Sequence, residues 1–222
     1  KSLEPYRATL GLSAGTPIDI DIVREHGSVA DGTSIYLIAK AFILHISPES
    51  FPDVAREEAE AMALARSRLG HTTGSVVLPV IAAGRIKGRS FMVIPSCRPL
   101  SDNPIVGRVQ RFLLQPNVLN WLRSLASASA TPSPAAACAF EAGFQNICCH
   151  PKVSSRLKES AKQGLRLLDS GLVPRFTPMH GDFWKGNIFL KKGRDFVVID
   201  WRSSRMDGYG IYDLVRFAGS FR

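Results

Sequence analysis

Alternating apolar and polar residues near the N-terminus predict a series of short β-strands. From residue 17 to residue 23, isoleucines alternate with Asp19 and Asp21, which is the two-residue period of a half-buried strand. A glycine-containing loop follows, and then two β-rich runs, 35–39 and 41–46, which Lys40 separates as a tight turn. The pattern predicts an antiparallel meander with a glycine-containing loop after its first strand.

A strongly helical stretch interrupts these strands. Residues 54–69 are rich in Ala, Glu, Arg and Leu, and Gly70 stands where a helix would end. Two further strand candidates, 76–82 and 90–95, flank a glycine-containing turn at 83–89. Strands with one inserted helix predict a small α+β region that ends near residue 95.

The remaining chain is predicted to be mainly helical. A connector at 96–100 leads to a helical region at 108–128 and, further along, to an amphipathic helix at 153–169. Between the two helices, residues 127–137 are mostly Ala, Ser and Pro. We interpret this low-complexity stretch as a flexible loop.

The composition is typical of a folded protein. Apolar residues make up 45% and charged residues 21% of the chain, which excludes a disordered, collagen-like or coiled-coil protein. The longest apolar run, 75–83, is roughly half as long as a membrane-spanning helix, and the N-terminus shows no secretory signal. The four cysteines lack the spacing of a disulfide framework or a zinc site. We therefore expect reduced thiols, a cytoplasmic location and no membrane span.

Positive charge is concentrated in the last third of the chain. The net charge of +9 divides into +2 for residues 1–150, with 14 basic and 12 acidic side chains, and +7 for residues 151–222, with 14 and 7. Such a field attracts phosphorylated small molecules, nucleic acid or an anionic membrane surface. Because no nucleic-acid-binding signature accompanies the charge, we do not expect nucleic acid as a partner.

The residues with the clearest chemistry lie in one loop and at the end of the strand after it. His180, Asp182 and Asn187 share a polar, glycine-containing segment, and the β-rich run 196–199 leads directly to Asp200. Phosphoryl transfer uses one carboxylate to orient the attacking hydroxyl, while an amide and a second carboxylate hold the magnesium ion that bridges the nucleotide phosphates. The spacing from Asp182 to Asn187 lets one loop serve both tasks.

This segment resembles the catalytic and metal-binding loops of the aminoglycoside phosphotransferase and choline kinase-like family, small-molecule relatives of the protein kinases. The resemblance rests on three ordered motifs: His180-Gly181-Asp182-Phe183-Trp184-Lys185-Gly186-Asn187, then Ile199-Asp200-Trp201, then Gly208-Tyr209-Gly210-Ile211-Tyr212-Asp213-Leu214. It implies an α+β, bilobal protein kinase-like fold. An N-terminal nucleotide-binding lobe, with an antiparallel sheet and one helix, would span 1–95. A mainly helical C-terminal lobe with the catalytic and metal-binding loops would span 96–222.

The resemblance also implies roles for the residues of the three motifs. Asp182 would be the catalytic aspartate, and Asn187 and Asp200 would be the magnesium ligands. His180 and Asp213 would support the loop without taking part in the chemistry.

We also expect roles for three further residues, on the basis of the same resemblance. Lys185 is either a solvated loop lysine or a second phosphate contact. The connector that begins at Ile94 and includes Ser96 would be the hinge, where backbone groups meet the adenine of the nucleotide.

The expected phosphate-binding lysine is the point where the sequence departs from the family pattern. In this family a strand lysine reaches the α and β phosphates and is held by a helix glutamate, for which Glu58 is the best match and Glu57 the next. Lys40 ends a run that is similar to the kinase strand motif containing this lysine, but it lies at the predicted turn between two strands. If the two β-rich runs are successive strands, His45 takes the lysine's position. A neutral imidazole cannot replace a permanent ammonium, so either phosphate binding is weakened or another cation compensates.

These assignments predict a magnesium-dependent enzyme that transfers the γ-phosphoryl group of ATP or GTP to a hydroxyl group of a small molecule. The acceptor would be a sugar, an aminoglycoside or an amino alcohol, and the basic C-terminal third favours an uncharged or phosphorylated sugar over a polycationic aminoglycoside. The alternative is a catalytically weak or inactive kinase-like module that binds nucleotide or a protein partner, in line with the missing lysine. The intact Asp182, Asn187 and Asp200 favour the enzyme.

Overall fold

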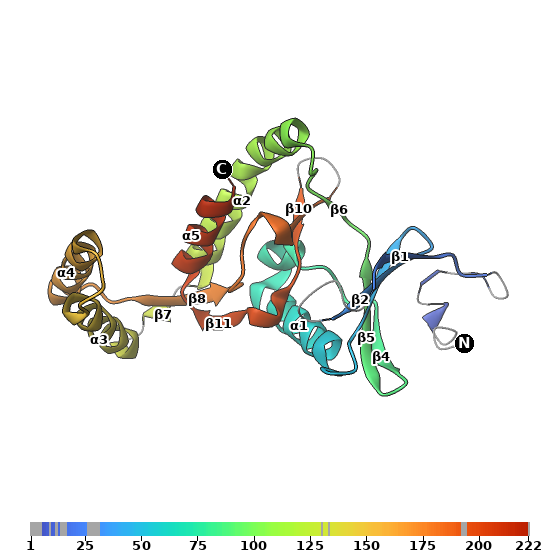
Figure 1. Cartoon of the computed structure of the whole chain (residues 1–222), viewed down its shortest axis with the longest axis horizontal. Coiled ribbons are helices and arrows are strands. Elements are labelled where there is room, and N and C mark those ends of the chain that lie inside the picture. The colour runs from blue at the N-terminus through green and yellow to red at the C-terminus, as the bar shows by residue number, and fades with distance from the viewer. Residues whose placement is uncertain are drawn as a thin grey trace.

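The strands of the N-terminal half form one antiparallel sheet (Figure 1). The computed structural model describes residues 6–8, 10–11, 13, 17–25, 32–129, 131–132, 134–191 and 195–221. In the order in which they pair, the strands are β1 (Ile20–Arg24), β2 (Ser34–Ile38), β3 (Phe42–Ile46), β5 (Arg89–Pro95) and β4 (Ala82–Ile86).

A tight hairpin joins β2 to β3. Its turn places Ala39 and Lys40 in the left-handed backbone region, with φ values of 49° and 54°. The predicted meander of antiparallel strands is therefore confirmed. Gly27, in the loop predicted after the first strand, lies outside the described residues.

One long helix, α1 (Val54–Thr73), packs against this sheet and confirms the predicted inserted helix. Its regular part ends where predicted, at Gly70, whose φ of 71° and ψ of −175° are not helical, and a short helical segment follows this kink up to Thr73. Glycine tolerates this positive φ because it has no Cβ.

The apolar run predicted as a strand at 76–82 is instead a buried connection. A short 3₁₀ helix, η2 (Gly74–Val76), follows α1, Val77 forms an isolated parallel bridge to the C-terminal half, and β4 begins only at Ala82. Burial alone explains the apolar composition here, so a run of this kind does not distinguish a strand from a core-lining loop. The turn predicted at 83–89 is shortened to Lys87 and Gly88.

The chain beyond the sheet combines helices with two small three-stranded sheets. The helices are α2 (Pro104–Ser129), α3 (Pro134–Cys149), α4 (Ser155–Asp169) and α5 (Gly210–Ser220). One sheet pairs in the order β10 (Phe196–Val198), β9 (Ile188–Leu190), β6 (Arg98–Pro99), and the other in the order β11 (Arg205–Gly208), β8 (Arg175–Met179), β7 (Thr131–Pro132). The 3₁₀ helices η3 (Lys185–Asn187) and η4 (Trp201–Ser203) lie within the motif loops.

The low-complexity stretch predicted as a flexible loop at 127–137 is largely helical. Helix α2 continues to Ser129, and α3 begins at Pro134. Alanine has the highest helix propensity and proline is favoured in the first helical turn, so the composition that indicated a loop also suits a helix start. Helices α3 and α4 pack as a pair that projects at the left of Figure 1.

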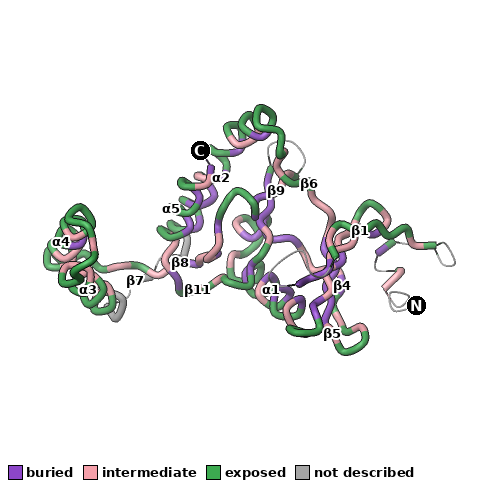
Figure 2. Tube along the Cα trace, in the orientation of Figure 1, coloured by how far each residue is buried: buried purple, intermediate pink, exposed green. Residues whose placement is uncertain are grey.

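The main hydrophobic core joins α1 to the C-terminal half (Figure 2). Ala55 and Met62 of α1 are buried in the same cluster as Trp121 of α2 and Phe183 of the loop after β8. The rings of Trp121 and Phe183 stack with their centroids 5.5 Å apart. A second, smaller cluster that includes Val93 lies on the opposite face of the five-stranded sheet. The α1 helix is thereby fixed against the loop that contains the candidate catalytic residues.

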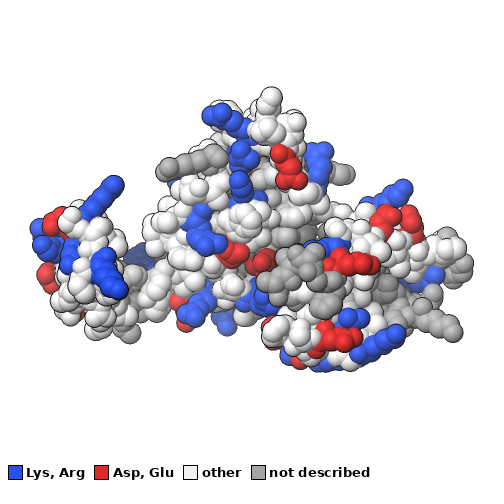
Figure 3. Space-filling model, in the orientation of Figure 1, with Lys and Arg blue, Asp and Glu red and all other residues white. Residues whose placement is uncertain are grey.

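The fold is α+β, with an antiparallel five-stranded sheet and a helix followed by a mainly helical region, as predicted. The boundary near residue 95 between two lobes stays a prediction. None of the helices in the described part of the chain is long and apolar enough to cross a membrane. The four cysteines carry free thiols. On the face shown in Figure 3, Lys and Arg side chains gather over α2, α5 and the α3–α4 pair.

Candidate active site

The loop after β8 turns sharply at Gly181. Its φ of 83° belongs to the left-handed region, and a Cβ added there would lie 2.4 Å from the carbonyl oxygen of Ser203. Only glycine fits both the conformation and the space. The turn brings the next residue, Asp182, to the surface of the molecule beside α5.

Both carboxylate oxygens of Asp182 have partners. The Nδ2 atom of Asn187 donates to Oδ2 at 3.1 Å and also to the backbone carbonyl oxygen of Asp182 at 2.9 Å. The Nη2 atom of Arg216, from α5, forms an ion pair with Oδ1. The side chain that the resemblance makes the catalytic aspartate is therefore oriented from two sides.

Asp213, in the first turn of α5, supports this loop from beneath. Its carboxylate is fully buried and accepts hydrogen bonds from the backbone nitrogens of His180, at 2.6 Å, and Gly181, at 3.0 Å. Burial raises the pKa of Asp213 to about 6, against the opposing effect of these two donors. The residue holds the backbone of the loop and has no open path to a substrate.

His180 connects the loop to the strand that leads to Asp200. Its Nδ1 accepts from the backbone nitrogen of Asp182 at 3.3 Å, so Nε2 carries the proton and donates to the carbonyl oxygen of Ile199 at 2.9 Å. Burial lowers the pKa of His180 to about 4, which keeps the ring neutral. A neutral ring in this tautomer connects the two motifs through these two hydrogen bonds.

The cleft between the sheet and these loops brings together five of the residues singled out from the sequence. Asn187 and Asp200 line a cavity of about 340 Å³, and His45, Glu58 and Ile94 line it as well. The backbone nitrogen of Ile199 donates to the carbonyl oxygen of Asn187 at 3.0 Å, which fixes the spacing of the two motifs. Asp200 itself has the left-handed values φ 64° and ψ 60°.

The donor atoms in this cleft suit a magnesium ion. Because the Nδ2 atom of Asn187 donates to Asp182, its amide oxygen is the atom left for a ligand role, and Asp200 adds a carboxylate. Oxygen atoms from one or two protein groups, completed by water and substrate phosphates, form the usual magnesium environment. Within the described residues, no cluster of three or more His, Cys, Asp or Glu side chains offers a different kind of metal site.

Glu58 contacts the backbone of the Asp200 motif. Its Oε1 accepts from the backbone nitrogen of Trp201 at 2.7 Å, and its Oε2 accepts from that of Arg202 at 2.8 Å. Burial raises the pKa of Glu58 to about 7. Glu57, the second choice from the sequence, is exposed and lines a different hollow. In this chain the buried helix glutamate therefore holds the backbone that follows Asp200.

The strand register places His45 in the cleft and Lys40 outside it. His45 pairs with Ile35 on β2 and Met92 on β5, and its neighbours in the lining of the cavity include these two residues. Lys40 is exposed at the hairpin turn. This is the arrangement expected if the two β-rich runs are successive strands.

Two arginines that the sequence analysis did not single out also line the cleft. Arg24 comes from the end of β1 and Arg202 from η4. They are candidates for the additional cation that a histidine at the lysine position requires. Arg216, at Asp182, is a third residue that the analysis missed, and its position three residues after Asp213 on α5 is the one signal that relates it to the motifs.

The structure separates the two residues expected at the hinge. Ile94 lines the cleft, whereas the backbone nitrogen of Ser96 donates to the carbonyl oxygen of Ala41 at 2.8 Å. The N–H group of Ser96 is thus committed to the hairpin turn. Ser96 also lines a second cavity, and the role of Ser96 in nucleotide binding stays a prediction.

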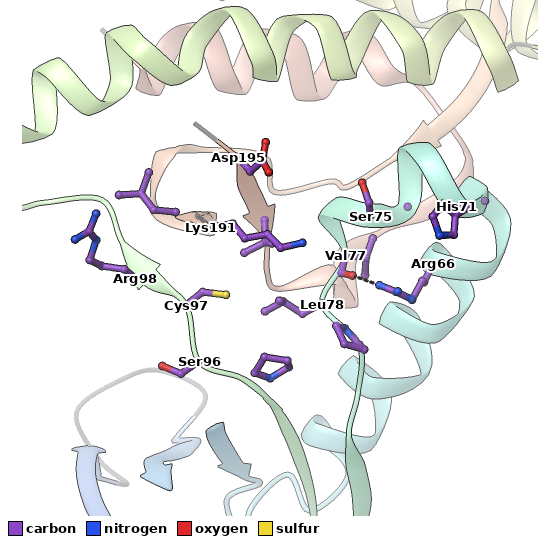
Figure 4. Close-up of a pocket in the computed structure, with 16 residues that line it drawn as sticks. Arg66, His71, Ser75, Val77, Leu78, Ser96, Cys97, Arg98, Lys191 and Asp195 are labelled. Atoms are coloured by element: carbon purple, nitrogen blue, oxygen red, sulfur yellow. Dashed lines mark hydrogen bonds between the residues drawn. The ribbon is translucent and has the colours of Figure 1, made fainter. Parts of the chain in front are cut away.

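The second cavity, of about 1280 Å³, lies between the connector and the end of α1 (Figure 4). Cys97 and Leu78 project into it, and the Lys191 side chain extends across it. Arg66 donates to the carbonyl oxygen of Val77 at 2.6 Å at its edge. None of the motif residues Asp182, Asn187 and Asp200 lines this space.

Lys185 stands apart from the cleft lining. It is exposed in η3, and its backbone nitrogen donates to the Oγ of Ser220 at 3.1 Å. The position agrees with a solvated loop lysine and leaves a phosphate contact as a prediction.

Comparison with known sequences identifies the family of this chain. The profile of the phosphotransferase enzyme family, APH, matches residues 23–222, which include the sheet from the end of β1 onward, α1 and the three motif loops. The chain belongs to the phosphotransferase enzyme family. A search of curated proteins gave no significant match.

Solved structures of APH-type enzymes share the fold at low sequence identity. A thermostable mutant of aminoglycoside phosphotransferase APH(4)-Ia, in a ternary complex with AMP-PNP and hygromycin B, has a TM-score of 0.55 and 14% identity over 96% of this chain and 75% of that one. Spectinomycin phosphotransferase APH(9)-Ia, in complex with ADP and spectinomycin, gives 0.51 and 12% over 98% and 72%. A fructosamine-3-kinase candidate from Haemophilus somnus 129PT gives 0.51 and 16% over 93% and 72%. The bilobal protein kinase-like fold implied by the resemblance is thereby confirmed.

Proposed function

We propose that this phosphotransferase is a magnesium-dependent small-molecule kinase that transfers the γ-phosphoryl group of ATP or GTP to a hydroxyl group. The observation that carries the proposal is the hydrogen bond between Asn187 Nδ2 and Asp182 Oδ2, at 3.1 Å. It couples a proton-accepting carboxylate to a metal-ligand candidate within one loop. Asp200 lines the same cleft beside Asn187. Phosphoryl transfer depends mainly on such positioning and on charge stabilisation.

Asp182 would orient the acceptor hydroxyl and accept its proton as the oxygen attacks the γ-phosphorus. Asn187 and Asp200 would hold the magnesium ion, which neutralises the phosphates and the charge that develops on them. Asp213 and His180 keep the loop in place through their hydrogen bonds to its backbone. The nucleotide base would lie against Ile94 and the β2–β3 hairpin, where the cavity is lined by apolar side chains.

The phosphates would be held without the usual strand lysine. His45 is the residue expected at its position, and Arg24 and Arg202 line the same cavity as His45. A guanidinium group remains charged at all physiological pH values and binds phosphate oxygens in a bidentate manner. Arg24 and Arg202 would therefore supply the permanent positive charge that His45 lacks.

The alternative, a kinase-like module that binds nucleotide without turnover, is favoured by His45 alone. One experiment separates the two proposals. ADP release is followed with ATP, magnesium and a panel of sugars, sugar phosphates, amino alcohols and aminoglycosides, with wild type and Asp182→Asn. The enzyme proposal expects acceptor-dependent ADP release that falls by about 10²-fold or more in Asp182→Asn.

A thermal-shift measurement completes the comparison. Nucleotide and magnesium together should raise Tm by more than the sum of their separate effects, and Asp200→Ala should remove this cooperativity. Nucleotide binding that is independent of magnesium, with no ADP release for any acceptor, would support the non-catalytic module and overturn the kinase proposal.

A further inference from the structure

The arginine on the candidate catalytic aspartate is the starting point. Arg216 comes from the middle of α5, thirty-four positions after Asp182, and its Nη2 atom pairs with Oδ1 of that carboxylate. Oδ2 is already engaged by Asn187 at 3.1 Å. A hydroxyl group that is to give its proton to Asp182 therefore meets a carboxylate in which each oxygen already accepts one hydrogen bond and the negative charge is paired with Arg216.

The pair is accessible from solution on the side of α5. The side chains of Arg216 and Asp182 are 40% and 33% exposed, so a small molecule can reach both. The guanidinium carbon of Arg216 also lies 5.9 Å from the centre of the Tyr212 ring, which is itself exposed. Asp213, the other acidic group of this turn, is fully buried and accepts two backbone hydrogen bonds. It presents no free carboxylate to an approaching acceptor.

Arginine has five N–H donors in a planar fork, and one Asp182 oxygen uses only part of them. An incoming phosphate or carboxylate group can take over the guanidinium in a bidentate contact, because both are oxyanions with the matching geometry. The exchange leaves the arginine paired and releases Oδ1 of Asp182. A cationic amine at the same place would instead meet a like charge and leave the ion pair intact.

We propose that the acceptor is a hydroxyl compound with an oxyanionic group, and that this group binds Arg216 and thereby frees Asp182. The inference rests on the proposed kinase function and names the substrate class of that site. In the transfer step, the acceptor oxygen forms a bond to the γ-phosphorus and the bond from phosphorus to the β,γ-bridging oxygen breaks. The hydroxyl proton goes to Oδ1 of Asp182, and the nucleoside diphosphate leaves with the bridging oxygen and its electron pair. Arg216 is then a specificity-determining residue.

The first test compares matched acceptors. Hexose phosphates and sugar acids are measured against their parent sugars and against amino sugars, and kcat/KM is determined for wild type, Arg216→Gln and Arg205→Gln. Arg205, an exposed arginine of β11, is the control for loss of one surface charge. Loss of a charge-assisted contact should lower kcat/KM for the anionic acceptors by about 10-fold to 100-fold in Arg216→Gln. The ratio of kcat/KM for the anionic acceptors to kcat/KM for the uncharged sugars should fall in Arg216→Gln, and Arg205→Gln should keep the wild-type ratio.

The second test measures the anion site without turnover. Sulfate is added to the protein in the presence of magnesium and ADP, so that the nucleotide site is filled, and Tm is compared with that in sodium chloride of equal ionic strength. Sulfate should raise Tm by more in wild type and Arg205→Gln than in Arg216→Gln, in which only the general stabilising effect of sulfate remains. The phosphate and carboxylate arms of the first test identify which oxyanion the site prefers.

The outcomes distinguish this inference from the proposed function. If uncharged sugars or aminoglycosides are the best acceptors and Arg216→Gln does not change the order, the acceptor class is wrong even though the kinase proposal stands. If no acceptor is phosphorylated, the kinase proposal fails, and the sulfate measurement still decides whether Arg216 binds an oxyanion. An equal sulfate effect in wild type and Arg216→Gln overturns the inference.

Discussion

Oε1 of Glu58, on α1, lies 2.7 Å from the backbone nitrogen of Trp201, the residue that follows Asp200. Its second oxygen receives the backbone N–H of Arg202 at 2.8 Å. Glu58, the residue that best matches the helix glutamate of the family pattern, is thus hydrogen-bonded to the backbone of the Asp200 motif. The helix therefore determines where the candidate metal ligand Asp200 stands.

Replacing Glu58 should weaken both the fold and metal-nucleotide binding. Glu58→Ala leaves two inward-facing N–H groups without an acceptor, which should lower the free energy of unfolding by roughly 2–4 kcal/mol. Urea denaturation measures this loss, and titration with magnesium and ATP measures the affinity. Glu57→Ala, at the exposed neighbour, should change stability by less than about 0.5 kcal/mol. Equal effects of the two substitutions would contradict the positioning role.

The same carboxylate should give the stability a distinctive pH dependence. Burial raises the pKa of Glu58 from 4.5 to about 7. The folded protein then binds more protons than the unfolded chain between these values. The stabilisation that protonated Glu58 contributes is therefore fully present below about pH 4.5 and is lost as the pH rises through 7. Glu58→Gln removes this dependence.

The measurement is a comparison of unfolding free energies for wild type and Glu58→Gln at several pH values between 4.5 and 7.5. The difference, wild type minus variant, should fall as the pH rises, by at most about 1.4 kcal/mol per pH unit. Asp213 titrates in the same direction, and His180, whose pKa burial lowers to about 4, acts in the opposite direction. Both are present in the two proteins and cancel in the difference. A difference that rises with pH would show that the folded-state pKa of Glu58 is not raised.

The register of the β2–β3 hairpin predicts opposite results for two neighbouring basic positions. Lys40→Ala should leave the nucleotide affinity within about twofold, because an exposed charge at a turn contributes little. His45→Lys should strengthen nucleotide binding near pH 8, since an ammonium remains charged where an ordinary imidazole is neutral. Calorimetric titration of the two variants decides the matter. A large loss in Lys40→Ala would move the phosphate site to the turn.

The turn at Gly181 should tolerate no side chain. Gly181→Ala combines a positive φ with a Cβ placed 2.4 Å from the carbonyl oxygen of Ser203, so stability should fall by about 2 kcal/mol or more. Gly219→Ala is the matched control, because its Cβ meets no atom within 4 Å and α5 favours alanine by up to about 1 kcal/mol. Thermal unfolding of both variants gives the comparison. Similar Tm changes would show that the turn can relax.

The parts of the site that the sequence predicted are formed by residues close together in the chain. Asp182 and Asn187 lie in one loop, and Asp200 directly follows a strand, so short-range spacing and the family resemblance were enough to relate them. The hairpin between β2 and β3 follows from the two β-rich runs, and it places His45 in the cleft lining.

The parts that the sequence did not predict depend on contacts between distant segments. Arg216 reaches Asp182 only because Asp213 anchors the first turn of α5 beneath the loop. The hydrogen bond from the N–H group of Ser96 to Ala41 joins two segments that are distant in the sequence, and the role of Ser96 in nucleotide binding stays a prediction. Helix α3 was missed because alanine, serine and proline occur both in loops and at helix starts.

The burial of Met62 and Ala55 of α1 beside Trp121 and Phe183 has a consequence for cooperativity. A fragment that ends at residue 95 would expose these α1 side chains and leave the Glu58 carboxylate without its two backbone donors. Such a fragment loses the apolar burial that offsets the entropy of ordering the helix. The sheet-bearing half thus depends on the other half to fold. The chain should therefore unfold in one transition, even though the sequence predicts two lobes.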